Sequence, residues 1–163
     1  MGWDLRSGLE VARGDYLVYL DGDGQVPTEA ALEVYRRLKE TRADIAKGRR
    51  YMREDGSVRT VTSLGFNTLF RLLFRTRNLW DVNGQPKGLT RSAHEQLDLR
   101  TDDWFTDAEI LLKAKELSLR VVEVPVRFHA RRVGGPNVGL GTVWEFLVNM
   151  ARWRLGHHPA QRR

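Results

Sequence analysis

Two aspartates stand one residue apart where a short apolar run ends. The run, YLVYL at 16–20, leads directly into DGDGQ at 21–25. Carboxylate and amide oxygens are hard ligands that suit Mg²⁺ or Mn²⁺, and such an ion is commonly shared with phosphate oxygens. The intervening glycines permit a tight turn and the close approach of a ligand. The segment therefore predicts a metal site formed by Asp21, Asp23 and Gln25.

The acidic segment has two other interpretations. An EF-hand calcium loop does not fit, because Val26 stands where that loop needs glycine and Leu32 where it needs a bidentate glutamate. An ordinary surface turn stays open, since aspartate and glycine both favour turns. The buried strand that precedes the segment favours the metal site.

Strands and helices are expected to alternate along the chain. Apolar runs predict strands at 16–20, near 45–46 and, by alternation, at 122–128. Pro125 places the last of these at an edge or near its own end. Helical spacing predicts helices after Pro27, around 66–73, from 106 to 117 and up to about 155. This pattern indicates an α/β layer fold, in which ligands bind beyond the carboxyl ends of the strands.

Composition narrows the classes of function. The 163 residues include 27 Lys and Arg against 21 Asp and Glu, a formal charge of +6. The absence of cysteine excludes a disulfide scaffold, a zinc–thiolate site and a thiol nucleophile. The basic charge suggests an anionic partner, and because no nucleic-acid motif is recognised, lipid or a phosphorylated small molecule is favoured over nucleic acid.

Seven short sequence motifs follow one another along the chain. They are GLEVARGDYLVYLDGDGQVP, KGRRY, RTVTSLGFN, DVNGQPKGLTR, FTDAEIL, VVEVPVRF and RRVGGPN. In order and spacing, residues 7–137 resemble the family 2 glycosyltransferases, and within them the polyprenyl-phosphate branch that includes dolichyl-phosphate mannose synthases. The resemblance implies a GT-A, Rossmann-like domain over 1–155, with a mostly parallel sheet and flanking helices. A basic tail at 156–163 is expected to be mobile.

The resemblance also implies a donor site. Asp21, Asp23 and Gln25 would hold the metal on the diphosphate of a nucleotide sugar. Arg49, in the segment that matches the family's Gly-x-Arg, would face phosphate, and Arg132 would lie near the donor diphosphate. Arginine suits this role because its planar guanidinium binds phosphate through paired hydrogen bonds and stays charged.

An acceptor site is implied by the next motif. Arg59 and Ser63, four residues apart, match the family's residues for the phosphate of the acceptor lipid, and Asn67 lies one turn further on. In the loop after the last strand, Asn137 stands where the family has serine, so that contact is not carried over.

Asp107 and Glu109 have two interpretations. In many family 2 enzymes a carboxylate in this region is the general base, which makes both residues candidates for catalysis. The sequence TDAE at 106–109 also has the form of a capping box, with Thr106 as the cap and Glu109 as its partner. An ionised lipid phosphate would need no strong base.

The implied reaction is a metal-dependent, inverting transfer of a hexose from a nucleotide diphosphate sugar to a polyprenyl phosphate. A cytoplasmic location is expected, with peripheral membrane contact if Trp144 and the arginines that follow it lie on anionic lipid. The alternative is that the same helix docks on the sheet with its tryptophans in the core.

The enzymes of this family normally begin with two strand–helix units before the acidic segment, and this chain begins just before it. An N-terminally truncated domain, weakly active or inactive by itself, is therefore expected. The competing hypothesis is a non-catalytic module that binds phosphorylated ligands or a partner chain.

Overall fold

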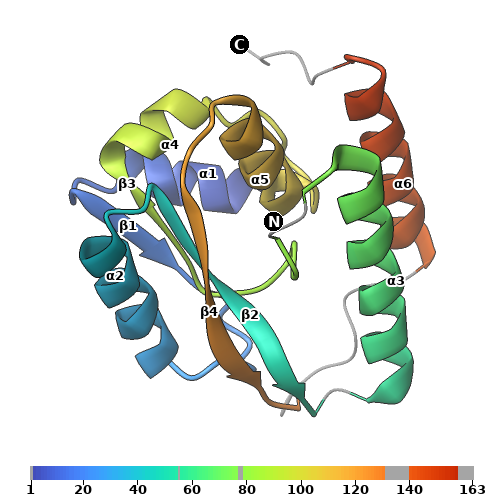
Figure 1. The fold of residues 1–163 in the computed structure, drawn as a ribbon, viewed down its shortest axis with the longest axis horizontal. Coiled ribbons are helices and arrows are strands. Elements are labelled where there is room, and N and C mark those ends of the chain that lie inside the picture. The colour runs from blue at the N-terminus through green and yellow to red at the C-terminus, as the bar shows by residue number, and fades with distance from the viewer. Residues whose placement is uncertain (1, 55, 77–78, 131–139, 158–163) are drawn as a thin grey trace.

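A computed structural model describes residues 2–54, 56–76, 79–130 and 140–157, without the side chains of 52, 53, 57–59 and 140. Figure 1 shows helices packed on both faces of one open sheet. The elements are, in order, α1 (Gly2–Val11), β1 (Tyr16–Tyr19), α2 (Glu29–Thr41), β2 (Ile45–Arg53), α3 (Ser57–Phe74), β3 (Lys87–Thr90), α4 (Arg91–Leu97), α5 (Thr106–Glu116), β4 (Val121–Phe128) and α6 (Leu140–Arg154).

The strand order in the described sheet is β1-β3-β2-β4. β3 pairs antiparallel with β1 and with β2, while β2 and β4 are parallel neighbours. Three strands therefore run in one direction, as the expected mostly parallel sheet requires, but β3 is inserted against them. β4 lies at one edge, which agrees with the presence of Pro125 in it.

One face of the sheet is covered by α2 (Figure 1). Val34 and Leu38 of α2 are completely buried in a cluster with side chains of β2 and β4. The contact is close above β3: a Cβ on Gly88 would lie only 2.8 Å from side-chain atoms of both Val34 and Leu38. A larger residue at this point would force the Val34 and Leu38 side chains to move.

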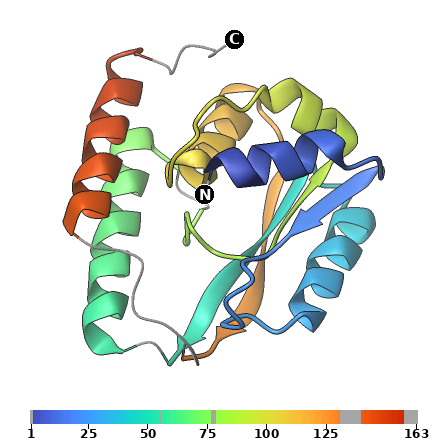
Figure 2. The same cartoon turned by 180° about the vertical axis from the view of Figure 1, so that it is seen from behind.

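The opposite face is covered by α1, α4 and α5, seen from behind in Figure 2. Leu17, Ile45 and Leu89, one from each of three adjacent strands, form a buried cluster with Leu9 and Ile110 of the covering helices. β1 contributes side chains to both faces, Leu17 to this cluster and Val18 to that of α2, which is why its apolar residues run continuously instead of alternating.

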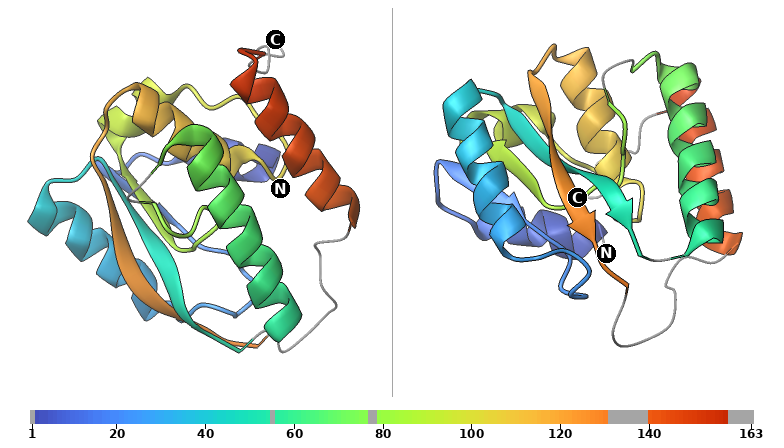
Figure 3. Two further views of the ribbon diagram at one scale, coloured as in Figure 1. Left: turned by 45° about the vertical axis from the view of Figure 1, so that its right-hand side comes forward. Right: turned by 60° about the horizontal axis from the view of Figure 1, so that its bottom comes forward.

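Beyond α5, α3 and α6 lie side by side, as both views of Figure 3 show. A second core joins them to α5 through aromatic side chains, including Phe70, Phe105, Phe146 and Trp153. Phe105 lies about midway in this group, with ring centroids 6.0 Å from both Phe146 and Trp153.

The capping box predicted at 106–109 is wrong. Phe105, not Thr106, is the N-cap of α5, and it makes no side-chain cap. The Thr106 hydroxyl lies 3.1 Å from the Thr101 carbonyl and 3.0 Å from that of Asp103. Glu109 accepts hydrogen bonds from the amides of Arg100 and Thr101, each at 2.9 Å. The preceding loop competes successfully for both side chains that the box would have used.

Candidate functional site at the strand ends

The acidic segment forms a turn directly after β1. Asp23 accepts a hydrogen bond from the Gln25 amide (3.1 Å), which is an Asx turn. Gln25 is buried, and its side chain donates to the His129 carbonyl (3.1 Å) while its own carbonyl accepts from the His129 amide (2.8 Å). The turn is thereby fixed to the chain just after β4. The assignment of Gln25 as a metal ligand stays a prediction.

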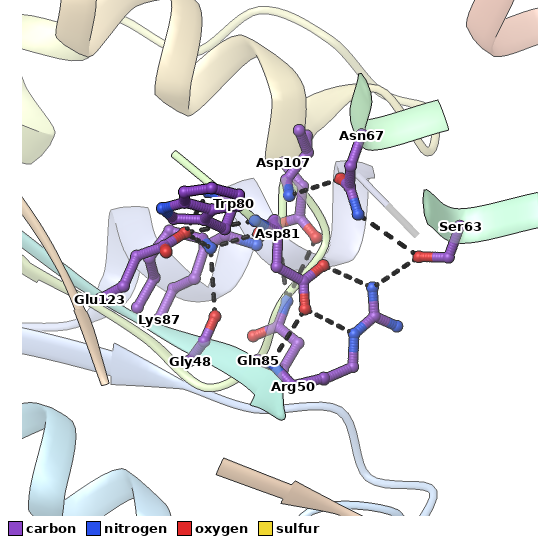
Figure 4. Close-up of polar contacts among 12 residues, drawn as sticks. Gly48, Arg50, Ser63, Asn67, Trp80, Asp81, Gln85, Lys87, Asp107 and Glu123 are labelled. Atoms are coloured by element: carbon purple, nitrogen blue, oxygen red, sulfur yellow. Dashed lines mark hydrogen bonds and ion pairs between the residues drawn. The ribbon is translucent and has the colours of Figure 1, made fainter. Parts of the chain in front are cut away.

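A buried polar group lies beside this turn. The Asp107 carboxylate, at the start of α5, accepts from the Tyr19 hydroxyl (3.1 Å) and from the Gln85 amide (3.3 Å). The Lys87 ammonium forms an ion pair with Asp107 at 2.7 Å and is completely buried. Figure 4 shows Gln85, Lys87 and Asp107 converging from a loop, a strand and a helix.

The surroundings of Asp21 disfavour its negative charge. Burial, followed by the negative charge of Asp107, raises the pKa of Asp21 above its ordinary value; Lys87 opposes the rise and Asp23 adds to it. Among the described residues, no three histidine or acidic side chains converge as a complete metal site. Mg²⁺ is often held by only one or two carboxylates together with substrate phosphates. The Asp21–Asp23 pair fits that pattern.

A second polar group lies in the second half of β2. Arg50 donates to both carboxylate oxygens of Asp81, from Nε at 2.7 Å and Nη2 at 2.6 Å, and its backbone amide donates to the same carboxylate at 3.0 Å. Burial alone would raise the pKa of Asp81, but the hydrogen bonds and charge of Arg50, with the charge of Lys47, hold it well below its usual range. Arg50 Nη2 also lies 3.4 Å from the Ser63 hydroxyl of α3 (Figure 4).

The loop that carries Asp81 is bound on both sides. On the α3 side, Asn67 accepts from the Val82 amide at 2.9 Å. On the sheet side, Glu123 of β4 accepts from the Trp80 and Asp81 amides, at 2.9 and 3.2 Å, and from the Lys47 ammonium, at 3.1 Å. The loop therefore spans the space between the sheet and α3.

Two glycines let this loop lie directly on β2. A Cβ on Gly48 would fall 2.1 Å from the Gln85 carbonyl oxygen, and one on Gly84 would fall 2.0 Å from the Gly48 carbonyl oxygen. The two backbones also share a hydrogen bond from the Gly48 amide to the Pro86 carbonyl, at 2.7 Å. No side chain fits between them.

The two polar groups are joined by a row of residues across the sheet. Tyr19 faces Lys87 in the register of β1 and β3, Lys87 faces Lys47 in that of β3 and β2, and Lys47 faces Glu123 in that of β2 and β4. We call Tyr19, Lys87, Lys47 and Glu123 the polar row. Burial lowers the pKa of Lys47, against the opposing charges of Glu123 and Asp81.

Other predicted site residues have different surroundings. Arg49 is exposed and lies over the Trp80 ring, 5.6 Å from its centroid, so Arg50 is the arginine of this strand that reaches Ser63. The side chain of Arg59, all of Arg132 and the tail from 158 lie outside the described residues. Glu109 is completely buried, with an ion pair to Lys113 at 2.9 Å. Its catalytic role and that of Asp107 stay predictions.

Sequence reasoning did not find Arg50, Asp81, Lys47 or Glu123. One signal was available, because Gly48 and Arg50 themselves have Gly-x-Arg spacing. Charged residues within strands, such as Lys47 and Glu123, were a second signal, since a charge in a buried strand needs a partner.

Of the two alternatives for the last helix, docking in the core describes one of its sides, and membrane contact stays a prediction. Phe146, Met150 and Trp153 are buried in the aromatic core, whereas Trp144 is 69% exposed. Exposed apolar side chains also occur on the adjacent α3, among them Leu64 and Leu72. Among the described residues, no helix combines the length and apolar character needed to cross a bilayer.

Two acidic residues directly after one strand and an arginine in the second half of another place charged side chains on the side of the sheet where open α/β domains bind ligands. A family model described as glycosyl transferase family 2 matches residues 1–98. The chain therefore belongs to glycosyl transferase family 2.

Several curated proteins are similar to this chain. Glycosyltransferase AglD of Haloferax volcanii is 35% identical over 131 residues, which is 77% of this chain and 21% of that protein. Polyprenol monophosphomannose synthase of Mycolicibacterium smegmatis is 29% identical over 164 residues, covering 94% and 58%. Dolichyl-phosphate beta-glucosyltransferase of Drosophila melanogaster is 34% identical over 140 residues, covering 78% and 43%. The chain thus spans less than two thirds of each of these relatives.

Proposed function

We propose that this domain transfers a hexose from a nucleotide diphosphate sugar to a polyprenyl phosphate. The observation that carries the proposal is the presence of two charged centres, Asp21 and Asp23 directly after β1 and Arg50 beside Ser63 in the second half of β2. The first suits the donor diphosphate and the second suits an acceptor phosphate. The names of relatives that act on polyprenol and dolichyl phosphates support this choice of acceptor.

The proposed reaction is an inverting displacement. An ionised oxygen of the acceptor phosphate forms a bond to the anomeric carbon while the bond from that carbon to the donor diphosphate breaks, and the nucleoside diphosphate leaves with the electron pair. Mg²⁺ or Mn²⁺ bound by Asp21 and Asp23 would neutralise charge on the diphosphate. Arg50, together with Ser63 and Arg59, would bind and orient the acceptor.

Membrane contact follows from a lipid acceptor. The domain would lie on the cytoplasmic face with the exposed apolar side chains of α3 and α6, such as Leu64 and Trp144, against the lipid. Arg152 and Arg154 in the last turn of α6 would favour anionic headgroups.

The test is nucleotide release by the natural full-length protein, measured with GDP- and UDP-sugars, undecaprenyl phosphate and Mn²⁺. The Asp23→Ala variant should lose at least about a hundredfold in turnover, because it removes a carboxylate from the proposed metal. Asp15→Ala, an exposed aspartate before the same strand, is the matched control and should keep full turnover. Undiminished turnover in Asp23→Ala would exclude the metal assignment.

The alternative of a non-catalytic module has its own outcome in the same experiment. Calorimetric binding of a nucleotide sugar, without acceptor-dependent release of nucleotide, would favour that module over the transferase.

A further inference from the structure

We propose that Lys47 and Glu123 form a positioning pair for Arg50, so that the acceptor phosphate depends on two residues that do not touch it. The inference rests on the proposed function for its ligand, but the positioning itself is a property of the chain alone. It deepens the acceptor site by naming what holds its arginine in place.

Glu123 gathers donors from the loop that carries Asp81. Its Oε1 accepts the backbone amides of Trp80 (2.9 Å) and Asp81 (3.2 Å) as well as the Lys47 ammonium (3.1 Å). Two consecutive amides bound by one carboxylate oxygen fix the direction of the peptide between them. The Asp81 side chain leaves the loop at this point.

Lys47 completes the attachment of the loop. Its ammonium is completely buried and contacts three oxygens: the Glu123 carboxylate and the carbonyls of Gly48 and Asp81. An ammonium has three donors, so each is matched by one acceptor. The loop is thus bound through both the amide and the carbonyl of Asp81.

Asp81 passes this constraint to Arg50. Both of its oxygens are used by Arg50, in a bidentate pair with contacts of 2.6 and 2.7 Å, which sets the plane of the guanidinium as well as its position. The guanidinium then lies 3.4 Å from Ser63, and the Arg50 side chain also lies over the Phe128 ring at 5.1 Å. A shift of Asp81 would therefore move Arg50 relative to α3.

Stability by itself is a weak reason for this arrangement. A buried ion pair often contributes no more than well-packed apolar residues of the same volume, because both charges lose their hydration. The feature that apolar residues could not reproduce is the direction imposed on Trp80 and Asp81 through their amides.

The experiment compares four forms of the 163-residue chain: wild type, Glu123→Ala, Glu123→Gln and Asp44→Ala. Glutamine keeps an oxygen that can accept the two loop amides. Asp44 accepts the Arg120 amide at 2.7 Å just before the same two strands begin, three residues before Lys47 and Glu123 in each, which makes it a matched control. The position of Arg50 is followed by the NMR signal and hydrogen exchange of its Nε–H, and ligand binding by calorimetry with farnesyl phosphate.

Glu123→Ala should abolish the protection of the Arg50 Nε–H and weaken farnesyl phosphate binding about tenfold or more, the effect of losing hydrogen bonds to a charged group. Glu123→Gln should stay within about threefold of wild type, and Asp44→Ala should bind normally. An unchanged Arg50 signal in a folded Glu123→Ala would overturn the proposal. If that variant does not fold, Lys47→Met must show the same loss of Nε–H protection, or the proposal fails.

The two proposals fail separately. If wild type does not bind farnesyl phosphate while Glu123→Ala still releases the Arg50 Nε–H, the lipid phosphate acceptor is wrong and the positioning pair stands. If wild type binds the ligand and Glu123→Ala binds it equally well, the acceptor stands and the positioning pair is wrong.

Discussion

Replacing Gly48 by alanine tests how closely the Asp81 loop must lie on β2. The new Cβ would fall 2.1 Å from the Gln85 carbonyl oxygen and 2.6 Å from its carbon, both backbone atoms that cannot rotate away. Overpacking of this kind costs about 1–3 kcal/mol. The displaced loop would also lose the hydrogen bond from the Gly48 amide to Pro86, about 1 kcal/mol, while the lower entropy of the unfolded chain returns about 0.5–1 kcal/mol.

We therefore expect Gly48→Ala to reduce the free energy of unfolding by about 1–3.5 kcal/mol, which corresponds to a fall in Tm of roughly 2–14 °C. The assay is urea unfolding followed by circular dichroism, with Tm measured separately. Gly65→Ala is the control, because that glycine lies inside α3 with open space around its Cβ position and should gain about 0.5–1 kcal/mol. A Gly48→Ala variant as stable as wild type would refute the close packing.

Three further outcomes are expected. Trp153→Ala should lose about 3–5 kcal/mol of stability in denaturant unfolding because the side chain is buried, whereas Trp144→Ala should change stability by less than about 0.5 kcal/mol and weaken sedimentation with anionic vesicles; equal effects would contradict the two-sided helix. Because the pKa of Asp81 is lowered on folding, this carboxylate stabilises the folded state fully above its ordinary pKa of 3.8, and the stabilisation is lost as the pH falls below that value. Asp81→Asn should therefore be less stable than wild type at neutral pH and lose less stability in acid. Parallel curves of stability against pH for the two proteins would argue against the ion pair. Glu109→Gln should cost about 1.5–3 kcal/mol in thermal unfolding, because an amide group would face two backbone donors, and a neutral effect would show that the loop does not need the carboxylate.

Much of the fold follows from local pattern. The apolar run before Asp21, the alternation around Pro125 and the helical spacing of α2 and α3 each predicted an element that the structure contains. Strand order did not follow, because β3 inserts between β1 and β2 through pairing between residues far apart in sequence. The four residues of β3 contain no local pattern that indicates their partner strands.

The candidate site was predictable where suitable side chains directly follow a recognisable strand in the same stretch of sequence, as Asp21 and Asp23 do. It was not predictable where function depends on the side of a strand. Arg49 and Arg50 are adjacent and chemically identical, yet only Arg50 points to Asp81, and the choice depends on the register of β2. The capping box failed for a related reason, since Glu109 bonded to a loop whose approach no local rule describes.

Gly88 determines more than the fit of α2. It follows Lys87, and successive residues of a strand face opposite sides of the sheet. If β3 slipped by one residue in its pairing, either Lys87 or Leu89 would come to lie beneath Val34 and Leu38, where even a Cβ would lie only 2.8 Å from both side chains. The missing side chain on one face therefore locks the alignment of the strand, and with it the presence of an ammonium beside Asp107 on the other. A substitution of Gly88 that shifted β3 beneath α2 would therefore remove the Lys87 ammonium from Asp107 on the opposite side of the sheet.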